Sequence, residues 1–273
     1  MSLVREAIAR YHKLIESPPY IDLAWAHELD ERIKQEKLGG RPVSPVLRPH
    51  LITNRDYAAL GKASETLLSA ITRMGQAVLS NPALMSRIQL LPAERMLAAV
   101  EPGYEGLSVT SLLDATINEG TVEFVGHAAD VPAGVLYGDA LADLYYEAPL
   151  VKEFRKKYKL RKIGGLKNLL TGILKAYKGY GGKNKKPTIA IVEFRQPSQP
   201  IASSEYWGLA EFFNREGYAT EIISPEQLEF RNNVLRKGAR FSSPATPPLY
   251  RQGLTRQRDA LPPPEAPLTR ISQ

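Results

Sequence analysis

The chain has 273 residues, 43% of them apolar and 24% charged, with a formal net charge of +7. This composition is ordinary for a globular protein and excludes a collagen-like, coiled-coil or wholly disordered chain. The absence of cysteine excludes disulfides, thiol catalysis, cysteine-based zinc sites and iron–sulfur clusters. The sequence has neither a signal-peptide pattern nor the roughly 20 consecutive apolar residues that span a bilayer, so we expect a cytoplasmic protein without membrane contact.

The first part of the chain is rich in helical patterns. Apolar residues recur at intervals of three and four over residues 1–38 and predict two helices separated by a pair of prolines. Thr53 or Asn54 can cap a third helix that runs to about Leu79. Shorter helical segments follow it, so residues 1–105 are predicted to form a helical N-terminal region.

The pattern then changes to an extended one. The segments 107–113 and 121–127 are apolar and compatible with strands, and the turn signal at 118–120 lies between them. A hairpin or an adjacent strand pair is therefore expected. A helix is predicted over 134–150 from the spacing of its leucines and tyrosines.

Residues 187–223 predict a β–α–β unit. A buried strand over 187–194 is followed by a helix that Gly217 ends and by a second strand over 218–223. Such a unit implies a parallel strand pair with a right-handed crossover. Ser224, Pro225 and Glu226 predict the start of another helix. The predicted fold class is α/β, with α+β as the alternative, and residues 106–236 form its second region.

Residues 237–273 differ from the rest of the chain. They hold seven of its 21 prolines and six basic residues against two acids, without any helical or strand period. One interpretation is a disordered tail rich in proline and arginine. The interpretation that we favour is translation in a different reading frame after about Arg236, because the pattern breaks abruptly inside an α/β unit.

Positive charge is concentrated between Lys152 and Lys186, which enclose thirteen lysines or arginines and one acid. Such a block can bind phosphates by counterion release, which would make the chain a non-catalytic module for nucleic acid or another polyanion. The alternative is a solvated helix face, held to a core by Phe154 and Tyr158, with a flexible loop over 179–186. The predicted polyanion patch consists of Arg155, Lys156, Lys157, Lys159, Arg161 and Lys162.

No residue is predicted to be catalytic, because no nucleophile motif and no histidine pair occurs. Asp114 and Asp130 flank the predicted strand pair and can converge on a cation, although turn chemistry alone also explains them. Asp130 is also assigned to a substrate or anion site, which Arg195, Ser203 and Ser204 can line at the N-terminus of the predicted helix that they precede. Helix capping and loop hydrogen bonding are the alternative for these three residues.

Two blocks of sequence resemble glutathionylspermidine synthase-like, circularly permuted ATP-grasp ligases. The first block comprises VTSLLD at 109–114 and VEFVGHAADVPAG at 122–134. The second lies within 189–232 and includes IAIVEFRQP, AEFFNREGY and SPEQLEFRN, which resemble the α/β region that precedes the grasp domain. The resemblance covers roughly residues 15–236.

The resemblance implies descent from a ligase that joins a small carboxylate to an amine and uses ATP and Mg²⁺. Asp114 and Asp130 match two acids of the family pattern. Asp114 matches the first metal-site acid, so it is the residue assigned to an incomplete metal site. Gly126, Ala128 and Leu112 stand where the family has glutamate, asparagine and arginine. Loss of the glutamate and the asparagine removes most of a Mg²⁺ site, and loss of the arginine removes a clamp for the transferring phosphoryl group. The expected protein is therefore a truncated or degenerate family member, inactive alone.

Overall fold

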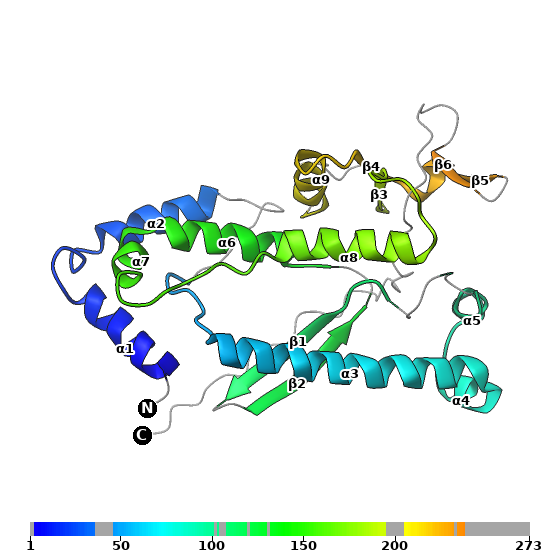
Figure 1. Ribbon diagram of the computed structural model, residues 1–273, viewed down its shortest axis with the longest axis horizontal. Coiled ribbons are helices and arrows are strands. Elements are labelled where there is room, and N and C mark those ends of the chain that lie inside the picture. The colour runs from blue at the N-terminus through cyan, green and yellow to red at the C-terminus, as the bar shows by residue number, and fades with distance from the viewer. Residues whose placement is uncertain are drawn as a thin grey trace, which may run out of the picture.

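The protein combines helices with a few short strands (Figure 1). The computed structural model describes residues 3–35, 46–100, 103, 108–118, 121–129, 132–194, 205–231 and 234–237. The helices are α1 Leu3–Ile15, α2 Ala24–Gln35, α3 Asn54–Ser80, α4 Pro82–Arg87, α5 Pro92–Ala98, α6 Val135–Glu147, α7 Pro149–Phe154, α8 Gly165–Gly179 and α9 Glu205–Arg215. The strands are β1 Leu112–Asn118, β2 Thr121–Ala128, β3 Ile189–Val192, β4 Thr220–Ile223, β5 Leu228–Arg231 and β6 Val234–Lys237. Apart from Lys237, the predicted tail 237–273 lies outside the described residues.

The helices predicted in the N-terminal region are confirmed. Helix α1 ends before Ser17, and α2 follows the proline pair. Thr53 caps α3, since its hydroxyl accepts a hydrogen bond from the backbone N–H of Asp56 at 3.0 Å. The Asn81 side chain accepts hydrogen bonds from the backbone N–H groups of Ala83 and Leu84, so Asn81 caps the start of α4 directly after the end of α3.

The predicted hairpin is confirmed, but its first strand is displaced along the chain. Strands β1 and β2 pair antiparallel, with Asp114 opposite Gly126 and a bulge after Asp114. Because β1 begins at Leu112 and continues through the β-branched Thr116 and Ile117, Asp114 lies inside the strand. The expectation that Asp114 ends this strand was wrong.

Strands β3 and β4 form the predicted parallel pair, with α9 between them in the chain. Gly217 follows α9 with a φ of +85°, a left-handed conformation that glycine adopts without strain. The Asn214 side chain donates to the carbonyl oxygens of Ala210 and Thr220 and accepts the N–H of Thr220 at 3.0 Å. These bonds fasten the end of α9 to the start of β4.

The helix predicted at Ser224 was wrong. Residues Pro225–Gln227 form a single 3₁₀ turn, in which the Ser224 N–H donates to the Gln227 side chain at 2.9 Å. The chain then becomes extended at once, because Leu228 and the residues after it pair antiparallel with β6. Ser224 therefore caps a single turn, and strand β5, not a helix, follows it.

Two apolar cores hold α1, α2 and α6 to α9 together. The first is built by α1, α2, α7 and the end of α6, and Tyr11 and Phe154 are almost completely buried in it. Their rings meet edge to face at 5.7 Å between centroids, and burial raises the pKa of Tyr11. The second core is formed by α8, α9 and β3, with Val135 and Leu136 at the start of α6 packed against it. Helix α6 therefore contributes to both cores.

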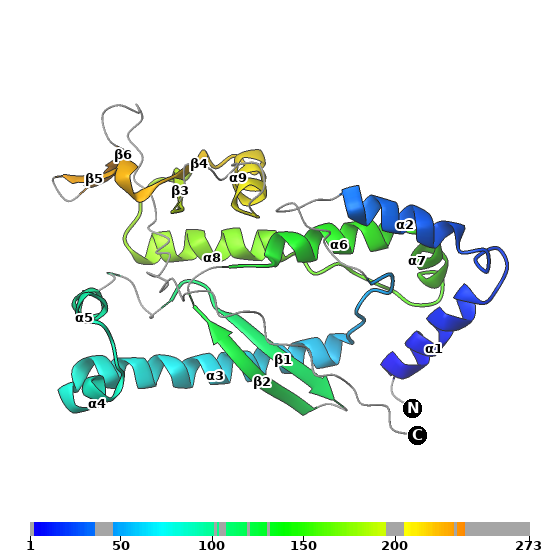
Figure 2. The ribbon, with the colours of Figure 1, turned by 180° about the vertical axis from the view of Figure 1, so that it is seen from behind.

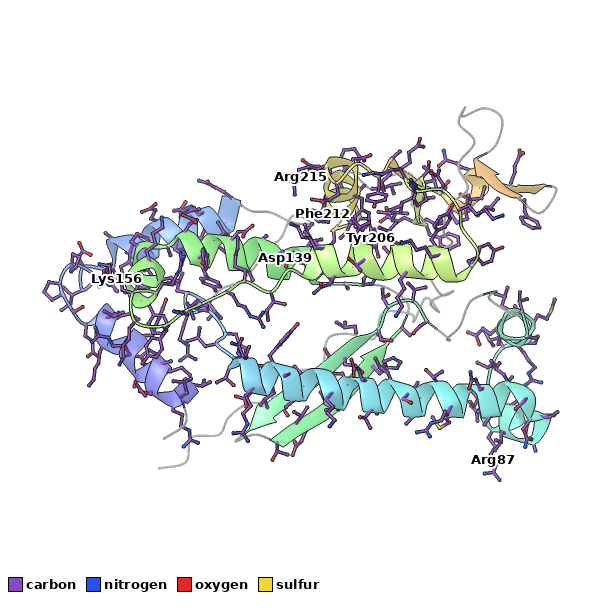
Figure 3. All side chains as sticks on the ribbon, viewed as in Figure 1. Arg87, Asp139, Lys156, Tyr206, Phe212 and Arg215 are labelled. Atoms are coloured by element: carbon purple, nitrogen blue, oxygen red, sulfur yellow. The ribbon has the colours of Figure 1, made fainter. Side chains whose placement is uncertain are left out.

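Helices α6 and α8 follow one another along nearly one line, and α9 lies on the opposite side of this line from α3 (Figures 1 and 2). Tyr206 and Phe212 lie on the side of α9 that faces α8 (Figure 3). None of the described residues of α3, α4 or α5 is buried, so these helices pack only loosely. In the described part of the chain, none of the helices has the length and apolar composition for crossing a membrane.

Replacement of Phe154 by alanine tests the first core. Phe154 is 2% exposed and touches the Tyr11 ring, so its loss should destabilise the fold by about 3–5 kcal/mol. Phe194→Ala is the matched control, because Phe194 is 65% exposed and its replacement should change stability by less than about 0.5 kcal/mol. Thermal unfolding followed by circular dichroism measures both. Equal losses would contradict the assignment of this core.

Candidate functional site

The predicted metal residue Asp114 lies on the exposed face of the hairpin. A Cβ atom placed at Gly126 would come within 2.7 Å of the Asp114 Oδ2 atom, so this carboxylate occupies the space of a side chain at position 126. Among the described residues, no three His, Asp or Glu side chains are grouped to hold a metal ion. Among the described residues, Asp114 alone does not fit the Mg²⁺ that the ligase resemblance implies.

The other residues predicted for a substrate or anion site are Asp130, Arg195, Ser203 and Ser204, and all four lie outside the described residues. The described chain resumes at Glu205, whose carboxylate accepts the backbone N–H groups of Gly134 and Leu136 at 2.9 and 3.0 Å. The start of α9 is thus bonded to the start of α6.

The first half of the basic block is largely neutralised by neighbouring acids. These pairs are exposed, so each stabilises the fold by at most about 1 kcal/mol, but each also cancels a positive charge. Hydrogen bonds from Tyr158 and Lys157 lower the pKa of Glu6. The ion pairs are Lys152–Glu147 at 2.9 Å, Lys156–Glu153 at 2.6 Å, Lys157–Glu6 at 3.2 Å, and Lys162–Asp143.

Aromatic rings occupy part of the same segment. The Arg155 guanidinium lies 3.5 Å from the centroid of the Tyr146 ring, a close cation–π contact. Tyr158 stacks on Phe154 at 4.7 Å between centroids, as expected of residues that hold this segment to a core. Helix α7 ends at Phe154, however, so Tyr158 belongs to the turn that follows.

Helix α8 separates lysines from apolar residues. Its buried stripe consists of leucines, Ile173 and Tyr177. At 100° per residue, Lys167, Lys175 and Lys178 fall within an arc of about 80° on another face. With Lys183 and Lys185 in the loop that follows, they are all exposed. Within the described part of the chain, none of these five lysines forms an ion pair with a carboxylate. We name Lys167, Lys175, Lys178, Lys183 and Lys185 the α8 lysine face.

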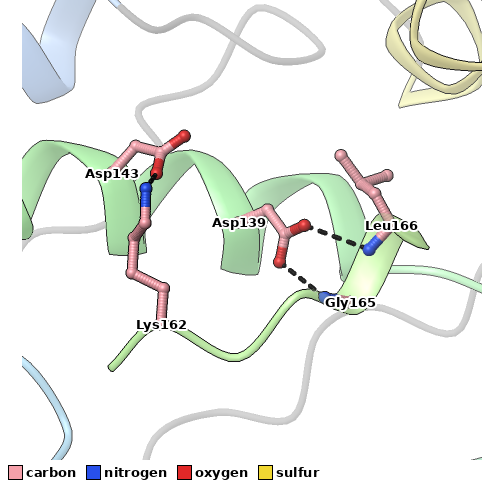
Figure 4. Close-up of polar contacts among 5 residues, drawn as sticks. All are labelled: Asp139, Asp143, Lys162, Gly165 and Leu166. Carbon is pink, nitrogen blue, oxygen red and sulfur yellow. Dashed lines mark hydrogen bonds and ion pairs between the residues drawn. The ribbon is translucent and has the colours of Figure 1, made fainter. Parts of the chain in front are cut away.

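Asp139 fixes the place where α8 begins. Its two carboxylate oxygens accept the backbone N–H groups of Gly165 at 2.9 Å and Leu166 at 3.0 Å (Figure 4). A negative charge at a helix N-terminus also interacts favourably with the helix dipole. A Cβ atom at Gly165 would lie 3.0 Å from Val135 and 3.2 Å from Asp139, so glycine allows this close approach. Asp139 lies where α6 meets α8 (Figure 3).

The two remaining members of the predicted patch line a cavity. Lys159 and Arg161 belong to an irregular segment between α7 and α8 that borders a space of about 680 Å³. Other lining residues come from α1, from residues 49–53, from the beginning of α3 and from α6. The basic block therefore contains lysines paired with acids, cations that line the cavity and the α8 lysine face, and Lys162 belongs to both of the first two groups.

Sequence reasoning assigned the patch to residues 155–162 and overlooked the α8 lysine face within the same block. A usable signal was present, because the lysines of α8 avoid its apolar stripe and no acid lies between Glu153 and Glu193. The role of Asp139 had no comparable signal, since its partner Gly165 lies 26 residues away in the chain.

Comparison of the chain with known protein families, curated proteins and solved structures found no match. The ligase resemblance therefore depends on the two sequence blocks alone.

The two acids of Figure 4 provide a matched pair of variants. Asp139→Ala should destabilise the protein by about 1–2 kcal/mol, because it removes two hydrogen bonds to the start of α8. Asp143→Ala removes an ion pair whose side chains are 46% and 64% exposed and should cost less than about 0.5 kcal/mol. Urea unfolding gives both values. A larger loss for Asp143→Ala would contradict this assignment.

Proposed function

We propose that this chain is a non-catalytic protein that binds a polyanion, nucleic acid in the first instance, through the α8 lysine face. One observation carries the proposal. Five lysines in the second half of the basic block have no carboxylate partner among the described residues, whereas acids neutralise much of the first half.

The spacing of these lysines suits an extended ligand. Lys167 and Lys178 are eleven residues apart, which corresponds to about 16 Å along a helix with a rise of about 1.5 Å per residue. A strand of phosphates laid along this face would contact several ammonium groups and release the counterions that surround it. Tyr180, which is 61% exposed, lies between Lys178 and Lys183 in the chain and offers a ring for stacking against a base.

The test compares two triple variants with the same change in net charge. Lys167→Gln/Lys175→Gln/Lys178→Gln removes part of the α8 lysine face and should flatten the dependence of log K on log salt by about 2, at about 0.7 per lost phosphate contact. The control, Lys152→Gln/Lys156→Gln/Lys157→Gln, removes lysines that already have carboxylate partners and should bind almost as the natural chain does.

Filter binding of a labelled single-stranded oligonucleotide over a salt series measures both slopes, and thermal unfolding checks that each variant is folded. The proposal fails if the natural chain does not retain the oligonucleotide at low salt. It also fails if the two triple variants lose affinity equally, because binding would then reflect net charge alone.

A second candidate is descent from the ligase-like family with loss of its activity. The parallel pair β3–β4 with α9 between its strands supports this candidate, because the second sequence block predicts such a unit. The position of Asp114 against Gly126, without grouped acids among the described residues, supports the loss of activity. We therefore propose that the chain alone does not ligate carboxylates to amines.

This second candidate predicts no ATP turnover by the isolated chain. Phosphate release from ATP should stay at the level of a protein-free control when Mg²⁺ and mixtures of small carboxylates and amines are supplied. The added amine is the informative variable, because ligation couples phosphate release to it. Phosphate release that requires both Mg²⁺ and an amine would contradict the proposal.

A further inference from the structure

The cavity beside the basic block has the size of a small-molecule site. It holds about 680 Å³, within the range of roughly 300–1,000 Å³ that is typical of such sites. It lies between the N-terminal end of α3, one side of α6 and the segment 159–163. Its apolar lining includes Leu51, Ile52, Val135, Leu141 and Ile163.

Among the described residues, the lining offers no free negative charge. Of the described residues that line the cavity, Asp139 is the one carboxylate, and its two oxygens accept the N–H groups of Gly165 and Leu166. The nearby Asp143 is paired with Lys162. An anion entering the cavity would therefore meet no unpaired carboxylate on its described wall.

Positive charge, in contrast, is available there. Lys159 and Arg161 line the cavity, are exposed to solvent and form no ion pair with a carboxylate among the described residues. A guanidinium presents two parallel N–H groups that match a carboxylate, and an ammonium adds a mobile point charge. These two cations thus stand at the edge of an apolar space.

We propose that this cavity binds an amphipathic acid, namely a long-chain fatty carboxylate. Its hydrocarbon chain packs against the leucine, isoleucine and valine side chains of the lining, and its carboxylate is held by Lys159 and Arg161. A purely apolar ligand would gain nothing from the two cations, and a polyanion would gain nothing from the apolar wall. The site uses different cations from the α8 lysine face, so it is independent of polyanion binding.

The place of the hydrocarbon chain is tested by filling the cavity. Gly138 of α6 lines it, and a Cβ atom there meets no atom within 4 Å, so Gly138→Phe puts a ring into the space without an initial collision. Gly172→Phe on α8 is the matched control, since a Cβ at Gly172 also meets nothing and this residue does not line the cavity. Ala142→Phe fills the same space from the same face of α6 if Gly138→Phe does not fold.

The probe is the fluorescent fatty acid cis-parinaric acid, titrated into the full chain. We expect saturable binding that the cavity-filling variant weakens at least about tenfold, as expected when a ligand loses its hydrophobic pocket, while Gly172→Phe leaves it unchanged. Melting curves establish that both variants are folded. The absence of saturable binding, or equal affinities for the two folded variants, would overturn the proposal.

The place of the carboxylate is tested by removing its cations. Lys159→Gln/Arg161→Gln should raise the dissociation constant of palmitate, corrected for the weaker binding of the probe to this variant, about ten- to a hundredfold, the usual effect of losing charge-assisted hydrogen bonds. The dissociation constant of the fatty alcohol of the same chain length, corrected in the same way, should not change, and the control Lys175→Gln/Lys178→Gln should behave as the natural chain. Equal weakening of acid and alcohol, or no weakening of either, would overturn the assignment of these cations.

Discussion

The hydrogen bonds from Gly165 and Leu166 to Asp139 set the position on which the rest of the structure depends. Helix α6 belongs to both apolar cores, because its beginning packs against α8 and α9 and its end against α1, α2 and α7. Where α8 starts relative to α6 therefore decides how the two cores are joined. The same joint fixes the direction of the α8 lysine face and closes one side of the cavity, which Asp139 and Gly165 line.

The distribution of acids gives the basic block its three different surroundings. Acids from α1, α6 and α7 reach the lysines that lie near the first core, and Tyr146 takes the guanidinium of Arg155. Helix α8 has no acid of its own, and its exposed lysines have no carboxylate partner among the described residues. The basic block is continuous in the sequence but forms separate surfaces in the fold, because acids pair with only some of its lysines.

Local signals predicted most of the helices and the strand pairing. Thr53 and Gly217 act within a few residues of themselves, so their positions could be read from sequence. Both bounds of β1 were wrong, because its apolar run begins before the paired residues and the strand continues past Asp114 through Thr116 and Ile117. Ser224 caps one turn where a helix was expected, because the chain then pairs with β6. The cavity could not be foreseen, since it is bounded by segments that lie about a hundred residues apart, and Asp130, Arg195, Ser203 and Ser204 lie outside the described residues.

Helix α3 is long but buries none of its described residues, so we expect it to open locally more easily than the helices of the two cores. Most helical stability in proteins comes from the packing of an apolar face and not from helix propensity. The capping bonds of Thr53 and Asn81 secure the ends of α3, whereas the glycines at positions 61 and 75 weaken its interior. The amide protons of α3 should accordingly exchange with solvent through local opening, well before those of α8, which the second core holds until the whole domain unfolds.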